Sequence, residues 1–166
     1  MVTAPPPPVQ DQRVPIEFFN LLDDEGWEPL RVDQASPAHF WNDGGSLADA
    51  PVDVEATFDG SMWYSTRVDR SFNLDGRRSA PNFTMPRHHH NMRVLIIVFG
   101  GEFTVEWDDD EQRNSRRVGS GEFWISDAGT PFTMTAGPEG VTYVETWPEP
   151  VAKLETYWHD VGWIHR

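Results

Sequence analysis

The chain contains no cysteine at all. This absence excludes disulfides, a thiol nucleophile and thiolate metal ligands, and it fits a reducing interior. Long apolar runs are also missing, since no stretch approaches the roughly 20 residues that span a bilayer. The N-terminus lacks the charged segment followed by an apolar core that secretion requires. We therefore expect a cytoplasmic protein without a membrane segment.

Basic residues are scarce. Lys and Arg number 13 against 27 for Asp and Glu, which gives a formal net charge of -14. Such a charge repels nucleic-acid phosphates and anionic lipid headgroups, so neither nucleic acid nor a membrane is an expected partner. A small-molecule substrate is expected instead, and an anionic one would need a local basic pocket. The candidates nearest in sequence to the histidine run described below are Arg67, Arg87 and Arg93.

Helical periodicity is rare in this sequence. Residues 16–22 have apolar side chains at a helical spacing and are followed by Gly26, so we predict one short helix there. Residues 27–59 carry mixed signals that favour short strands joined by loops. Other segments alternate polar and apolar residues between turn signals, which predicts strands. The clearest of these segments are 60–72, 102–107 and 141–147.

These patterns predict an all-β fold with little helix. At 166 residues the chain has the size of one domain. Residues 1–15 include four consecutive prolines, and we expect them to form a flexible, disordered arm. Residues 16–166 are then a single domain. Regularly spaced strands with turn signals favour an antiparallel sandwich or barrel.

Three consecutive histidines, His88, His89 and His90, precede an apolar run at 94–99 that ends at two glycines. The run is short and rich in β-branched residues, which predicts a strand buried on both faces. Side chains alternate along an extended strand, so His88 and His90 share one face and His89 lies on the other. Two imidazoles on one face can bind one metal ion. A solvated loop is the plain alternative for such a run.

The same region resembles the two sequence signatures of the cupin superfamily. Residues 88–105 follow the first signature, with an HxH pair and a glycine at the expected spacing, and residues 121–132 resemble the second. The resemblance covers residues 81–147. It implies a cupin-like double-stranded β-helix, a jelly-roll barrel whose site lies inside its wider end.

Cupins usually hold a divalent metal with two His and one Glu from the first signature and a third His from the second. His88 and His90 match the first two ligand positions. Val94 stands at the position of the Glu, and Phe132 stands at that of the last His. The resemblance therefore implies a divalent metal ion, Fe, Zn, Ni or Mn, with only half of the usual ligands present.

Glu145 is the strongest candidate for a further donor. In segment 141–147, Tyr143 and Glu145 share one face of the predicted strand. If this face lines the cavity, Glu145 could be a metal ligand or a general base; an exposed strand carboxylate is the alternative. Aromatic residues are abundant, and we expect Tyr64, Trp124 and Phe132 to contribute to substrate binding, while ordinary core packing accounts for most of the others.

Three functions remain open. The favoured one is a metal-assisted enzyme, a dioxygenase or a lyase, isomerase or cyclase, acting on a small apolar or aromatic molecule through His88, His90 and Glu145. The second is a metal-free enzyme in which a histidine acts as general base for dehydration or cyclisation. The third is a non-catalytic binding or sensing module. Cupins are often dimers and the aromatic C-terminal segment suits an interface, so a homodimer is one option.

Overall fold

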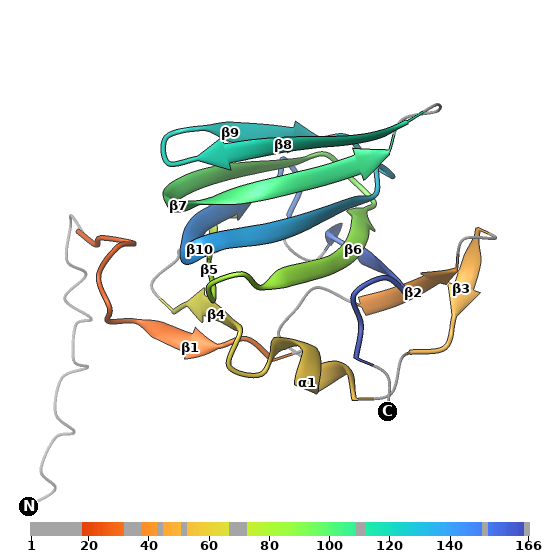
Figure 1. Ribbon diagram of the computed structural model, residues 1–166, viewed down its shortest axis with the longest axis horizontal. Helices are drawn as coiled ribbons and strands as arrows, with labels where there is room; N and C mark the ends of the chain where they lie inside the picture. The colour runs from red at the N-terminus through yellow and green to blue at the C-terminus, as the bar shows by residue number, and fades with distance from the viewer. Residues whose placement is uncertain are drawn as a thin grey trace, which may run out of the picture.

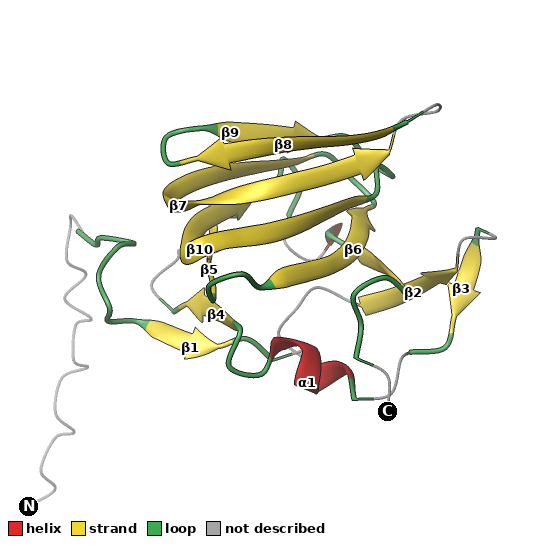
Figure 2. Cartoon of the chain, in the orientation of Figure 1, coloured by secondary structure: helices red, strands yellow, loops and turns green. Residues whose placement is uncertain are grey.

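The computed structural model describes residues 18–31, 38–42, 45–50, 53–66, 73–108, 112–150 and 153–164. These residues form a nearly all-β structure (Figures 1 and 2), as the sequence predicts. The arm expected at residues 1–15 lies outside the described residues. No helix in the described ranges is both long and apolar enough to cross a bilayer.

Two long strands organise the fold. The first half of β7 (Val94–Asp108) pairs with β9 (Phe123–Ser126), and its second half pairs with β8 (Arg113–Gly119). β10 (Phe132–Thr146) runs antiparallel along both halves of β7. Residues 102–107 lie in β7, which confirms the strand predicted there, and this part of β7 forms a hairpin with β8.

The other edge of β10 is also divided between two strands. Its first residues pair with β6 (Thr84–His90), and its last residues pair with β5 (Asp75–Ser79). On one side β5 pairs with β4, which pairs with β1; on the other side β6 pairs with β11, β11 with β2, and β2 with β3. The sheet therefore folds over through β7 and β10 into two facing layers, the jelly-roll arrangement expected from the cupin resemblance. The bounds of these outer strands are Trp27–Pro29 for β1, Ala38–Asn42 for β2, Ser46–Ala48 for β3, Met62–Ser65 for β4 and Thr156–His159 for β11.

The two long strands bend where they touch. The registers of β7 and β10 shift between Ala136 and Val141, and Val141 then pairs with Gly101. Gly101 has a φ of 74°, and a Cβ atom placed there would lie 2.1 Å from the carbonyl oxygen of Gly140. Only glycine fits such an approach of two backbones, so this residue permits both strands to pass from one layer to the other.

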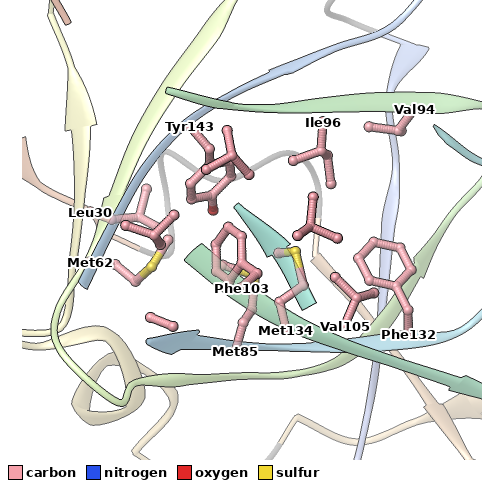
Figure 3. Close-up of a cluster of buried hydrophobic side chains, with 14 of the residues drawn as sticks. Leu30, Met62, Met85, Val94, Ile96, Phe103, Val105, Phe132, Met134 and Tyr143 are labelled. Carbon is pink, nitrogen blue, oxygen red and sulfur yellow. The ribbon is translucent and has the colours of Figure 1, made fainter. Parts of the chain in front are cut away.

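The core lies between the two layers (Figure 3). Val94, Ile96 and Val98 on β7 point inward and are at most 1% exposed. Their neighbours Leu95 and Ile97 are only half-buried. The prediction that this strand is buried on both faces is therefore wrong, because no further layer among the described residues fully covers its outer face.

Residues 18–22, the described part of the helix predicted at 16–22, are not helical. Residues 18–22 form an extended segment and a turn. The side chain of Asn20 accepts a hydrogen bond from the Leu22 amide at 3.0 Å and donates one to Asp23 at 3.0 Å. Such local bonds compete with helical backbone pairing. A short helix, α1 (Val54–Phe58), occurs instead within the region expected to hold only strands and loops.

Candidate functional site

The histidine pair lies on the inner face of β6. His88 and His90 are 2% and 4% exposed, and their ring centroids are 5.2 Å apart. His89 points to the other face, where its Nδ1 lies 3.0 Å from Nε2 of His159. The predicted alternation of the three histidines is confirmed, and the pair with one shared face is enclosed by the barrel.

The Nδ1 atoms of both inner histidines are held by neighbouring groups. His88 Nδ1 donates to the carbonyl of Pro86 at 2.8 Å, and His90 Nδ1 lies 3.2 Å from the hydroxyl of Thr156. A carbonyl can only accept, so the proton of neutral His88 sits on Nδ1 and the lone pair on Nε2. Hydrogen bonds of this kind to Nδ1 orient histidines that bind metals through Nε2.

Burial keeps His88 neutral. Loss of solvation, together with the nearby imidazole of His90, lowers the pKa of His88 to about 3. A neutral imidazole with an available Nε2 lone pair is the form that binds a metal or accepts a proton. His88 is therefore in this form at physiological pH.

Glu145 meets His90 inside the barrel. Its Oε1 lies 3.3 Å from His90 Nε2, and its side chain is 14% exposed. Nε2 of His90 is buried and forms no hydrogen bond. The structure thus brings together all three side chains predicted to be catalytic, and it leaves a buried nitrogen next to a carboxylate oxygen.

The carboxylate is charged despite its burial. Burial raises the pKa of Glu145, but His90 and then Arg77 outweigh this effect and hold the pKa below its usual value. Arg77 lies on β5 directly opposite Tyr143, and Asp75 lies opposite Glu145. Opposite residues of an antiparallel pair share a face, so this arginine adds positive charge on the same face as Glu145. Arg77 in turn forms an ion pair with Asp75.

The two substituted cupin positions face the same interior. Val94 is completely buried, and Phe132 is 2% exposed. The Phe132 ring centroid lies 4.6 Å from that of His88 and 6.3 Å from that of His90. Neither side chain can donate a lone pair. Among the described residues, no group of three or more His, Asp or Glu side chains forms a ready-made metal site.

Phe132 also lines a cavity of about 300 Å³. Trp124 and Phe132, two of the three residues expected to contribute to substrate binding, are among its lining residues. Tyr64 is not: it lies on β4, and its hydroxyl donates to Glu28 on β1 at 2.6 Å. The full lining comprises Val105, Trp107, Arg116, Val118, Trp124, Ile125, Ser126, Asp127, Thr130 and Phe132. Phe132 thus contacts both the cavity and the histidine pair.

Sequence reasoning missed two contacts of the site. Thr156 and Trp158 on β11 lie opposite His90 and His88, and the Trp158 ring centroid is 4.7 Å from that of His88. The aromatic residues of this segment indicate packing, but they do not indicate against which strand. β11 is inserted between β6 and β2, pairing parallel with β2, and such distant pairing leaves no local signal.

No protein-family model and no curated protein matches the sequence. Among solved structures, the chain is similar to oxalate decarboxylase from Bacillus subtilis, with 20% identity and a TM-score of 0.47 over 54% of this chain and 26% of that chain. Oxalate decarboxylase from Lactobacillus farciminis, in a formate complex, gives 21% identity and a TM-score of 0.46 over 54% of this chain and 29% of that one. Vicilin from hazelnut (Corylus avellana) has 20% identity and a TM-score of 0.45 over 58% of this chain and 31% of that chain.

These matches are partial. The chain spans at most 31% of the length of these three proteins. The fold assignment itself rests on the arrangement of strands around β7 and β10, and the activities of these proteins are not carried over to this chain.

Proposed function

We propose that this protein is a metal-assisted cupin enzyme that acts on a small apolar or aromatic molecule. The observation that carries the proposal is the buried Nε2 of His90, which has no hydrogen-bond partner and lies 3.3 Å from Glu145 Oε1. A buried polar atom without a partner costs free energy unless a ligand satisfies it. A divalent ion held by His88, His90 and Glu145 would satisfy this nitrogen.

The donor types suit such an ion. Two imidazoles and one carboxylate, with other positions open, form the ligand set of many mononuclear iron enzymes, and zinc, nickel and manganese also accept these donors. A bound ion of this kind supplies either a Lewis acid for lyase, isomerase or cyclase chemistry or, as Fe(II), a centre for oxygen chemistry. In this proposal, Glu145 on β10 is the carboxylate ligand. It replaces the Glu of the first cupin signature, whose position is occupied by Val94 on β7.

The protein residues have separate tasks in this proposal. Pro86 and Thr156 orient the imidazoles through Nδ1. His90 and then Arg77 hold the pKa of Glu145 below its usual value and so favour its charged form. The buried position of the histidines excludes bulk water from the reacting atoms, and the adjoining cavity, which Phe132 lines, holds the substrate.

The variant Glu145→Gln tests the third donor. It preserves the size of the side chain and removes the charge, so we expect affinity for Zn²⁺ or Mn²⁺ to fall roughly tenfold or more, as changes at metal sites do. Glu139→Gln is the matched control, because Glu139 lies exposed on the same strand. Equal metal affinity of both variants and the wild type would contradict a role for Glu145 as a ligand.

A metal-free acid–base enzyme is the second candidate. It is favoured by the lack of a preassembled group of three donors among the described residues and by the direct contact of His90 with an ionised carboxylate. His90 would then take a proton from the substrate at Nε2, and Glu145 would stabilise the resulting imidazolium. Turnover of small aromatic compounds, followed by proton NMR and oxygen uptake, separates the two candidates. Activity that survives complete chelation supports this second function, whereas activity that returns only with metal supports the first.

A further inference from the structure

Arg116 adds a positive charge to the lining of the cavity, which the sequence did not reveal. It lies on β8 opposite Val105, and Val118, two residues later, is a buried core residue. Residues two apart on a strand share a face, so Arg116 is on the inner face. Its side chain is 71% exposed, which places the guanidinium at the mouth of the cavity.

The charge of this guanidinium is only loosely balanced. Its carboxylate partner, Glu122, is 3.8 Å away. The other charged residue of the lining, Asp127, is engaged at 2.9 Å by Arg93, which is not part of the lining. The cavity therefore presents a cation at its mouth within a chain whose net charge is -14.

The rest of the wall is apolar and aromatic. Trp107, Trp124 and Phe132 supply three aromatic side chains from three strands. A volume of about 300 Å³ is at the small end of ligand cavities, which suits a molecule of one or two rings. Such a wall favours a flat ring, and an arginine at the mouth favours a carboxylate at one end of it.

We propose that this cavity binds a small aromatic carboxylate, with the ring between Trp107, Trp124 and Phe132 and the carboxylate at Arg116. This inference rests on the proposed function, since it names the class of substrate for the same site. The other arginines considered from the sequence are less suitable. Arg87 and Arg93 pair with Asp108 and Asp127, and Arg67 lies outside the described residues.

The test uses 2-naphthoate and its neutral analogue 2-naphthamide as probes, with affinities measured by isothermal titration calorimetry on chelator-treated protein. Arg116→Gln is compared with Arg113→Gln. Both residues lie on β8 with similarly exposed side chains, but Arg113 is on the outer face beside Glu106. The two variants lose the same charge, so long-range repulsion of an anion changes equally in both.

We expect Arg116→Gln to weaken naphthoate binding roughly threefold or more relative to Arg113→Gln, the scale of a solvent-exposed charge pair. Naphthamide affinity should be the same in both variants. Equal naphthoate affinity in the two variants, or no binding of either probe by the wild type, would overturn the inference. Metal is absent throughout, so failure here is distinct from failure of the metal proposal, which is judged by metal content.

Discussion

Phe132 on β10 lies directly opposite His88 on β6, with ring centroids 4.6 Å apart. The aromatic ring therefore occupies the place from which the second cupin signature would supply an imidazole. It also lines the cavity, so it contacts both the histidine pair and the cavity. In the cupin motif, Phe132 marks only a missing metal ligand. In the structure, it touches both the candidate metal site and the candidate substrate site.

Phe132→His should restore a donor at this place. Since opposite residues of an antiparallel pair have adjacent side chains, the new imidazole would lie beside His88. We expect metal affinity to rise roughly tenfold or more, on the scale by which site changes alter metal binding. Competition with a metal-sensitive dye measures the change. Phe132→Leu, which opens space without adding a donor, should leave affinity near the wild-type value; an equal gain in both variants would contradict the account.

Val94→Glu tests the other substituted position. Val94 is 0% exposed, so a carboxylate there would be buried without a partner and should destabilise the metal-free protein by about 3 kcal/mol. Added Zn²⁺ should recover much of this loss, since a ligand at 100 times its dissociation constant stabilises the folded state by about 2.7 kcal/mol. Denaturant titrations with and without metal provide the comparison. A variant that Zn²⁺ stabilises no more than it does the wild type would show that Val94 does not face the ion.

Stability of the metal-free protein should fall with acid in a defined window. The pKa of His88 is about 3 in the folded state, lowered mainly by burial, against roughly 6.5 when unfolded. Between these values the unfolded chain binds more protons, so the free energy of unfolding decreases as the pH falls. The slope from His88 is about 1.4 kcal/mol per pH unit.

Glu145 contributes at the acidic end of the same range. Burial raises its pKa, but His90 and Arg77 hold it below the unfolded value, so its stabilisation is present above the unfolded pKa and is lost as the pH falls through the folded one. Urea unfolding from pH 7 to 4 measures the combined slope. His88→Gln should flatten it between pH 6.5 and 5, above the range in which Glu145 titrates. An unchanged slope in that interval would show that His88 takes up its proton in the folded state.

Gly101→Ala should disturb the bend that the barrel depends on. The new Cβ would meet the Gly140 carbonyl oxygen at 2.1 Å in a backbone with a φ of 74°. We expect a loss of about 2 kcal/mol or more, measured by thermal or urea unfolding. Gly121→Ala is a useful comparison, because Gly121 also has a positive φ but no atom within 4 Å of the added carbon. A similar loss in both variants would attribute the effect to φ alone.

Much of the fold was predictable because its signals are local. The alternation of His88, His89 and His90 and that of Tyr143 with Glu145 follow from strand geometry, and both are confirmed. The short helix at Val54–Phe58 was not predictable, since a few residues of helix carry little periodicity. The turn at Asn20 was not predictable either, because its side-chain hydrogen bond overrides the helical spacing of the apolar residues.

The sequence allowed candidate site residues to be named, but it did not show which strands would surround them. The approach of Glu145 to His90 depends on the pairing of β10 with β6 and β7, and Arg77 reaches the site through β5. Tyr64 alternates correctly on its strand, yet β4 lies beyond β5, two strands from β10. Distances of this kind are set by strand order, which no single segment encodes.

Metal content is the most direct test of the central claim that the inner histidines hold a metal. Elemental analysis would compare tag-free wild type, purified without chelator, with the double variant His88→Ala/His90→Ala and with His89→Ala, whose side chain lies on the opposite face of the same strand. We predict close to one equivalent of a divalent metal in the wild type and in His89→Ala, and none in the double variant. A wild-type protein that cannot be loaded with metal, or a double variant that retains it, would contradict the account.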